Sequence, residues 1–335
     1  MSKVQLEDLS KKLGVSKTLI SMVINGKGDK YGISRKTQAQ VLGAIAESDY
    51  APNRFAKSLR TGRSNFIGLI VGDILNPFYS GIVKSVEQTL HGQGVNLMLG
   101  DTGGNEELEM EKVERMISLQ GVDGLIVASA FRNSSFYEQP RMAKIPIVFI
   151  HRMVPSFDAN YVVADNFGGA VELANHLLDK GCRQLACFAV TPLDVSPVND
   201  QIRGLKKALA MRGISMGGKM IKAVRPDRMA FDVQSHLRAV LKSGRNYDAI
   251  VVLNSIVAAV LLKILRKKEF RDMAGVQVAS LDDAELFNMV KKKITSVSQP
   301  TQDIGTNASR LLMDLIAGKI TGKSTVVINT KMVVR

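Results

Sequence analysis

The sequence is poor in the residues that build disulfides, metal sites and membrane spans. Its 335 residues include no tryptophan, two cysteines and four histidines, and aromatic residues make up 5% of the chain. No zinc-ligand spacing occurs, and no apolar run approaches the roughly 18 residues of a membrane helix. Cys182 and Cys187 flank a short apolar run, and residues five apart on a strand point to opposite faces, so we expect no disulfide. With no apolar signal region at the N-terminus, we expect a cytoplasmic protein.

Positive charge is abundant and unevenly distributed. The chain has 45 basic and 31 acidic residues, for a net charge of +14. Residues 1–64 hold 12 of the basic and 5 of the acidic residues, so a fifth of the chain carries half of the excess. This bias is typical of a nucleic-acid-binding module joined to a more neutral part, although a solvated charged face gives a smaller version of it. The length predicts two or three domains.

The stretch from Gly14 to Asn25 predicts a tight turn followed by a helix. An amphipathic run, 6–13, precedes it, and Ser16 can cap the second helix. One face of that helix is apolar, with Ile20, Val23 and Ile24 at helical spacing. The other face presents Lys17, Thr18, Ser21 and Met22 close to the helix N-terminus, where backbone amides attract anions. This surface suits a groove lined with phosphates, although small helical bundles without DNA contain similar turns.

A third helical pattern begins at Ser34 and is predicted to bury Val41, Leu42 and Ile45. It is followed by the segment Asp-Tyr-Ala-Pro-Asn-Arg-Phe-Ala-Lys-Ser-Leu-Arg at 49–60. With this segment the chain resembles the LacI/GalR family of bacterial transcription regulators over nearly its whole length. The resemblance implies a three-helix helix-turn-helix DNA-binding head at 1–51 and a hinge helix and linker at 52–63. It also implies an effector-binding and dimerisation core at 64–335 that is similar to periplasmic sugar-binding proteins.

The same resemblance implies the DNA contacts. Lys17, Thr18 and Met22 fall where the family contacts bases, and Ser16, Ser21 and Asn25 fall where it contacts phosphates. Met22 offers only an apolar contact or a weak acceptor where several relatives have arginine, or it is a surface methionine that packs on the head. The loop at 26–33 is longer than in the best-known relatives, and it either brings lysines to the DNA backbone or is solvated.

In the hinge, the resemblance makes Leu59 a wedge that enters the central step of the minor groove when two copies pair on DNA. Ala56 lies three residues earlier and so on the same helical face, and Arg60 resembles the basic residue that follows the wedge. So short a helix is not expected to persist alone, because helix nucleation is costly. Inserting an apolar side chain would kink the DNA and link its shape to the dimer.

The remainder alternates between strand and helix patterns, which predicts parallel sheets covered on both faces. Strands are expected at 65–71, 95–99, 124–128, 147–150, 161–164, 185–189, 249–253 and 276–281. Helices are expected from 76 to about 93 and at 106–119, 168–180, 200–212, 231–241 and 255–268. This is an α/β core of two doubly wound subdomains with a cleft between them at the carboxyl ends of the strands. By resemblance, the N-subdomain is about 65–163 plus 294–322, and the C-subdomain is about 164–293 plus 323–335.

The resemblance also implies an effector pocket at those strand ends. Its expected lining is Phe78, Tyr79, His151, Arg152, Gln201, Asn254 and Asp282. An aromatic pair with an amide and a carboxylate suits a polyhydroxylated ligand. Gln201 stands where many relatives have an arginine that grips the effector, so we expect a neutral or weakly charged sugar. Arg152 is the residue that would restore the missing charge.

Enzyme chemistry has little support in the sequence, and we expect neither catalytic residues nor a metal or cofactor. The segment at 317–324 resembles a phosphate-binding loop, but Ala317 stands where the first glycine belongs and the helix precedes the segment instead of following it. The sequence therefore predicts a homodimeric regulator, most simply a repressor, that binds palindromic double-stranded DNA. It would control a carbohydrate-utilisation operon in response to a sugar-derived effector. The alternative is a sugar-binding or sugar-processing protein that does not act on DNA.

Overall fold

The structure is a computed structural model that describes residues 4, 6–48, 62–216, 220–242 and 247–335. The chain divides into two compact units, Met1–Ser64 and Asn65–Arg335, which are called the head and the core below. Among the described residues, no helix is both long enough and apolar enough to cross a bilayer.

The head is a small helical unit built on the predicted turn. Its elements are α1 (Leu6–Leu13), α2 (Lys17–Ile24), the 3-10 helix η1 (Asp29–Tyr31) and α3 (Arg35–Ala46). Its buried centre is formed by Leu9, Ile20, Val23, Val41 and Ala44. The expectation for Leu42 was wrong, because this side chain is 52% exposed. The inward stripe of α3 runs through Val41, Ala44 and Ile45, which are spaced three and four residues apart, and Leu42 lies off that stripe.

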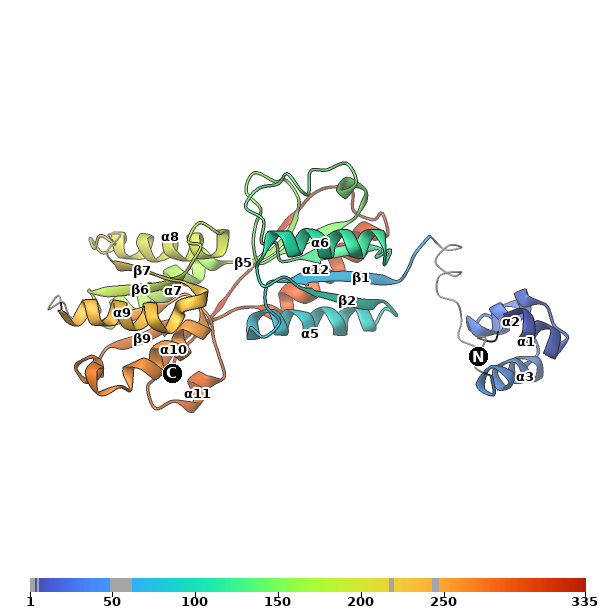
Figure 1. The fold of residues 1–335 in the computed structure, drawn as a ribbon, viewed down its shortest axis with the longest axis horizontal. Helices are drawn as coiled ribbons and strands as arrows, with labels where there is room; N and C mark the ends of the chain where they lie inside the picture. Colours follow the sequence, from blue (N-terminus) through green and yellow to red (C-terminus); the bar gives the residue numbers. More distant parts are fainter. Residues whose placement is uncertain (1–3, 5, 49–61, 217–219, 243–246) are drawn as a thin grey trace. The chain divides into compact units, whose positions relative to one another are not determined.

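The first sheet of the core has the order β11-β5-β4-β3-β1-β2 over the described residues, and the strand pairs are parallel. Its strands are β1 (Phe66–Val71), β2 (Asn96–Asp101), β3 (Gly124–Val127), β4 (Ile147–Ile150), β5 (Asn160–Ala164) and β11 (Thr325–Ile328). Helices α5 (Pro77–His91) and α12 (Thr301–Ile316) pack on one face. The other face is covered by α6 (Glu106–Ser118) and by the segment that holds the 3-10 helix η2 (Met142–Lys144) (Figure 1).

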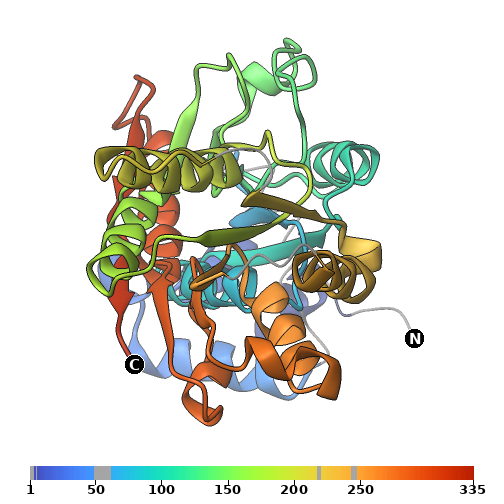
Figure 2. The ribbon, with the colours of Figure 1, turned by 90° about the vertical axis from the view of Figure 1, so that its left-hand side faces the viewer.

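The second sheet repeats this plan with the order β12-β10-β9-β8-β6-β7, in which β12 is antiparallel to β10. Its strands are β6 (Leu185–Val190), β7 (Ile221–Val224), β8 (Ala249–Val252), β9 (Gln277–Ser280), β10 (Ile294–Ser298) and β12 (Lys331–Val333). One face carries α7 (Asn166–Asp179) and α8 (Ser196–Met211), and the other carries α9 (Met229–Lys242) and α10 (Ser255–Leu265) (Figure 2). Short helices η4 (Pro226–Arg228), η5 (Lys268–Met273) and α11 (Leu286–Met289) complete it.

The chain passes between the two sheets three times, as expected. It crosses from β5 to α7, from β10 to α12, and from β11 to β12. The bounds differ from the expected ones, because β10 pairs with β9 in the second sheet and β11 pairs with β5 in the first. Residues 294–298 therefore belong to the C-subdomain and residues 325–328 to the N-subdomain. The apolar runs alone do not reveal this, since either sheet can accept such a strand and only the pairing decides.

Candidate functional site

The N-terminal turn of α2 is built as the sequence predicted. The hydroxyl oxygen of Ser16 accepts a hydrogen bond from the Leu19 backbone N–H at 3.1 Å and so caps the helix. Ser16, Lys17 and Thr18 are exposed on the outer face, while Ile20 and Val23 are buried beneath it. The helix therefore presents a hydroxyl, an ammonium group and free backbone amides on one side of the head.

Lys17 has a partner that the sequence analysis did not identify. Its ammonium nitrogen lies 2.9 Å from Glu7 Oε2 on α1, and both side chains are about half exposed. An ion pair this exposed contributes little to stability, and it is easily exchanged for a stronger acceptor. Glu7 could have been found from the sequence only by noticing that the two helices bring residues ten apart together.

Ser21, Met22 and Asn25 follow along the same helix. Ser21 and Met22 are half-buried, and Asn25 at the helix end donates from its amide nitrogen to the Ser21 carbonyl oxygen at 2.6 Å. Met22 therefore has an exposed part that can reach a base edge and a covered part that packs on the head. Its role in readout stays a prediction.

The loop after α2 is ordered. Gln38 of α3 donates from its amide nitrogen to Asp29 Oδ1 and to the Ile33 carbonyl oxygen, both at 2.8 Å. Gly28 lies directly under this side chain, where a Cβ atom would come within 2.4 Å of it. Lys27 and Lys30 stay exposed on the outside of the loop. Exposed lysines are compatible with both interpretations of this loop, contact with the DNA backbone and simple solvation, so the DNA contact stays a prediction. The three predicted hinge residues, Ala56, Leu59 and Arg60, lie outside the described residues.

In the core, the first sheet supplies an aromatic wall at the carboxyl ends of β1 and β4. The ring of His151 lies 4.5 Å from that of Phe78 and 5.6 Å from that of Tyr79, measured between centroids. Burial lowers the pKa of His151 to about 3, with a further contribution from the Arg152 charge, so the imidazole is neutral and packs as an aromatic ring. A Cβ atom at Gly72, just after β1, would lie 3.2 Å from the Tyr79 hydroxyl oxygen, so glycine there makes room for the phenol.

Strain in the backbone orients the next residue, Arg152. His151 has a φ of +66°, which is rare for a residue with a side chain, and the Arg152 backbone N–H donates back to the Ile150 carbonyl oxygen at 2.7 Å. The Nε atom of Arg152 is buried and has no hydrogen-bond partner. A buried donor without a partner is costly, and both it and the strained turn are typical of binding sites. The arrangement leaves a guanidinium edge that a ligand acceptor would satisfy.

The second sheet supplies a polar wall at the ends of β8 and β9. Asn254 caps α10, and its side-chain oxygen accepts from the Ile256 N–H at 2.8 Å, so its amide NH₂ group is what it offers to a ligand. Asp282 accepts a 3.3 Å hydrogen bond from the Ser255 N–H at the same helix terminus. The pKa of Asp282 is raised to about 7, chiefly by burial and also by the neighbouring Asp283 charge, while the Ser255 hydrogen bond acts to lower it. The carboxyl group is therefore poised between its charged and neutral forms near neutral pH.

Tyr79 is within electrostatic range of charged groups from both walls. The pKa of Tyr79 is raised chiefly by burial, while the Arg152 charge lowers it and the charges of Asp73 and Asp282 raise it. Tyr79 thus lies within reach of Arg152 on its own wall and of Asp282 on the opposite wall. Two contacts join the subdomains: the Met153 backbone N–H donates to the Ser196 hydroxyl oxygen at 2.8 Å, and Arg132 Nη1 lies 3.7 Å from Asp194 Oδ2.

Gln201 has a different environment from the other predicted pocket residues. It is only 4% exposed, and its amide nitrogen donates to Asn166 Oδ1 at 3.1 Å. Gln299 donates to the same oxygen at 3.4 Å and to the Leu281 carbonyl oxygen at 3.0 Å. Asn166 and Gln299 stand at two of the three crossovers. The Gln201 amide nitrogen is therefore hydrogen-bonded at the crossovers between the two subdomains, and only the tertiary contacts reveal this.

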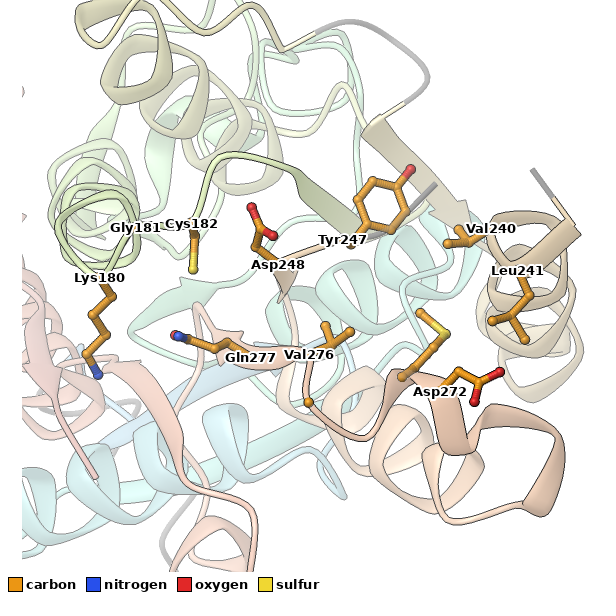
Figure 3. A pocket seen from close by; sticks show the side chains of 12 residues that line it. Lys180, Gly181, Cys182, Val240, Leu241, Tyr247, Asp248, Asp272, Val276 and Gln277 are labelled. Carbon is orange, nitrogen blue, oxygen red and sulfur yellow. The ribbon is translucent and has the colours of Figure 1, made fainter. Parts of the chain in front are cut away.

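A separate hollow of about 400 Å³ opens at the amino ends of β8 and β9 (Figure 3). Its polar groups do not converge on one point, since the labelled side chains of Lys180, Asp248 and Gln277 point in different directions. Asp248 is also engaged structurally, because its carboxylate accepts from the backbone N–H groups of Arg183 and Gln184 at 2.7 and 2.8 Å. Ligands of such sheets bind at the opposite, carboxyl ends of the strands, where the two walls described above lie.

Comparison with known proteins agrees with this architecture. Residues 64–334 match the family model for periplasmic binding proteins and the sugar binding domain of the LacI family. The ribose operon repressor of Halalkalibacterium halodurans is 31% identical, over 98% of this chain and 96% of the relative. The chain belongs to the LacI family of transcription regulators. The transcriptional regulator CelR of Thermobifida fusca is 29% identical over 98% of this chain and 97% of its own length.

Solved structures extend the likeness to the whole of this LacI-family chain. A complex of CelR with cellobiose has a TM-score of 0.71 and 27% identity, with 99% of both chains covered. The Lac repressor dimer bound to operator and an anti-inducer has a TM-score of 0.84 at 22% identity, covering 99% of this chain and 98% of that one, and shows the same fold. The predicted family and fold class are thereby confirmed, and the relatives are regulators and not enzymes.

Proposed function

We propose that this protein is a homodimeric repressor that binds a palindromic operator of a carbohydrate-utilisation operon and responds to a sugar-derived effector. The observation that carries the proposal is the pairing of two sites on one chain of this family. The head presents an exposed, capped helix, and the core holds Arg152, whose buried Nε has no hydrogen-bond partner, and Asp282, whose pKa is raised by burial. The protein would act in the cytoplasm and without catalysis.

The chemistry of α2 supports DNA binding. Lys17 and Thr18 would contact base edges, with Lys17 donating to guanine O6 or N7 after leaving Glu7. Ser16, Ser21 and Asn25 would contact phosphates around the same groove. Relatives across the whole length of the chain are named as operon repressors and regulators, and one related structure is a dimer on its operator.

The chemistry of the cleft supports a polyhydroxylated ligand. The rings of Phe78, Tyr79 and His151 would cover its apolar face. Asp282 would accept hydrogen bonds from hydroxyl groups on the other side, where Asn254 would donate, and Arg152 Nε would donate to a ligand oxygen. One relative is named a ribose operon repressor, and the structure of another is a complex with cellobiose. Ribose and cellobiose are both polyhydroxylated sugars.

The decisive experiment is fluorescence anisotropy of the full chain on the DNA upstream of its own gene, with and without members of a panel of sugars and sugar acids. We expect specific binding that weakens steeply with salt, because phosphate contacts release counterions. One or a few sugars should change the affinity. Asp282→Ala should keep DNA binding and lose the response, whereas Asp303→Ala, which removes an exposed carboxylate on α12, should keep both.

Failure to bind specific DNA at low salt would refute the regulator proposal and favour a sugar-binding protein that does not act on DNA. Full effector response in Asp282→Ala would place the effector elsewhere. The charge of the effector is tested by titrating matched pairs, such as a hexose and its hexuronate, by calorimetry. Binding of the acid alone, abolished by Arg152→Ala and not by Gln201→Ala, would overturn the neutral-ligand expectation.

A further inference from the structure

The side chain of Arg335 is unusually buried for an arginine outside a regular element. It follows β12, which pairs with β10 in the register Ser296 to Val333, and its side chain is only 12% exposed. Arginine is rarely buried unless its charge is paired. Its partners therefore show what the side chain does.

Three polar groups form a closed triangle at this position. Arg335 Nη2 lies 2.9 Å from Asp283 Oδ1, and Arg335 Nη1 donates to Ser296 Oγ at 2.7 Å. The Ser296 hydroxyl in turn donates to Asp283 Oδ1 at 2.6 Å. Ser296 is fully buried on β10. The ion pair is thus tied to the second sheet, in a setting where breaking one partner leaves an unpaired charge.

The remaining edges of the guanidinium group reach the next helix. Nε donates to Asn288 Oδ1 at 2.7 Å, and the group lies 5.8 Å from the centre of the Phe287 ring. Both residues belong to α11. The planar, five-donor group therefore joins β10, the turn between β9 and α11, and α11 itself, which the single ammonium group of a lysine cannot do.

That turn carries Asp282, the carboxyl group of the proposed effector site. Neighbouring residues of an extended chain diverge, so Asp283 points to β10 and Arg335 while Asp282 meets the N-terminus of α10. The charge that raises the pKa of Asp282 is that of Asp283 on its own turn, and Arg335 pairs with Asp283 at 2.9 Å. Asp282 in turn raises the pKa of Tyr79 of α5, on which Arg152 and Asp73 also act. The negative charge of Asp283 thus repels that of Asp282 and pairs with that of Arg335.

We propose that Arg335 is a positioning residue for the effector site, holding the β9–α11 turn against β10 and neutralising Asp283 next to the ligand-facing carboxyl group of Asp282. The role in effector binding rests on the proposed function. The effect of Arg335 on Asp282 does not, because it is a property of the protein without ligand.

The test measures the pH at which Asp282 ionises, with and without Arg335. The carboxyl bands of the full chain and of Asp282→Asn are compared by infrared difference spectroscopy between pH 5 and 9, and the midpoint of the change that only the original protein shows reports the pKa of Asp282. Melting temperatures are recorded in parallel. The same comparison is made with Arg335→Gln, and with Arg335→Gln together with Asp283→Asn. Arg225→Gln is the matched control, since it breaks another arginine–aspartate pair, with Asp232, and Arg225 follows β7 at the opposite edge of the sheet from β12.

We expect Arg335→Gln to move the midpoint upward by about half a pH unit or more, because Asp283 is then an unpaired negative neighbour. Adding Asp283→Asn should return the midpoint to the original value or below it. Arg225→Gln should lower the melting temperature without moving the midpoint. If Arg335→Gln does not fold, Arg335→Lys replaces it and should move the midpoint upward by a smaller amount.

An unchanged midpoint in the Arg335 variants, together with a lower melting temperature, would overturn the proposal and leave Arg335 a purely structural residue. Because this readout needs no ligand, it is separate from the fate of the proposed function, which fails if no sugar alters DNA binding. Where a sugar does act, Arg335→Gln should weaken its effect more at pH 7 than at pH 9.

Discussion

The head and the core hold their proposed functional groups in opposite ways. On α2, Lys17 and Thr18 are exposed, and the one described ion pair of Lys17 is a surface contact with Glu7. In the cleft, the ring of His151 is packed between aromatic neighbours on a strained turn, and Asp282 has a shifted pKa. A surface that binds DNA, a large hydrated anion, needs little preorganisation, because the charge of the DNA provides the attraction. A pocket for a small ligand must be prepared in advance, and this costs the free protein stability.

The largest effect on DNA binding is expected from a change of Leu59, the predicted wedge of the hinge. Leu59→Ala should lower specific DNA affinity by about 1 to 3 kcal/mol and reduce DNA bending, because the unstacking contact is lost. The fold and the effector affinity should stay the same. Affinity is measured by anisotropy, and bending by energy transfer between the labelled ends of the operator. Unchanged bending would show that Leu59 does not insert into the DNA.

The cost of the prepared pocket is tested by Asp282→Asn. A carboxyl group whose pKa rises to about 7 on folding, from its usual value near 4, destabilises the folded protein as pH increases between these values. The variant should therefore be as stable as the original protein near pH 4 and more stable at pH 8. After allowance for solvent screening, the gain should be on the order of 1 to 2 kcal/mol.

The measurement is chemical or thermal unfolding of both proteins across that pH range. A variant that is less stable at pH 8 would show that Asp282 is not under electrostatic strain, and the contrast with the head would fail. The exposed Asp303→Asn on α12 serves as the control and should leave the pH dependence unchanged.

Base readout by the head is tested by Met22→Arg. Arginine prefers a bidentate contact with guanine O6 and N7, so the preferred base should change at one position in each half-site. The symmetry of the site should be retained, and total affinity should change less than with Leu59→Ala. Selection of operators from a random pool with each protein gives the answer. An identical consensus for both would mean that Met22 does not face the bases.

The smallest expected effect concerns the partner of Lys17. Glu7→Gln should raise DNA affinity by less than about 1 kcal/mol, because an exposed ion pair no longer competes for the ammonium group. Glu47→Gln removes the same charge at the C-terminal end of α3 and controls for the change in net charge. Anisotropy at several salt concentrations separates the two, and a larger gain with Glu47→Gln would make the Lys17–Glu7 pair irrelevant to DNA binding.

Local signals were enough to place most elements. Ser16 caps α2 as expected, and Ser34, where the third helix was predicted to begin, is the N-cap of α3. The predicted strands and helices of the core overlap β1 to β6, β8, β9 and α5 to α10. The strands β7, β10, β11 and β12 were not anticipated, because short segments that polar residues interrupt or flank carry too little pattern to distinguish from a loop. The effector-pocket residues were predicted from a family resemblance and not from spacing, since their side chains come from distant strands, and they stay a prediction.

The sequence by itself determined the helix caps, the alternation of strand and helix, the charge of the head and the family, because these depend on residues a few positions apart or on composition. Tertiary structure decided which sheet receives β10 and β11, that Lys17 meets Glu7, that Gln201 joins the crossovers, and that Arg335 holds Asp283. Each of these depends on strand pairing or on contacts between residues far apart in the chain. Such contacts follow from how the layers pack, and no single segment of the sequence specifies that packing.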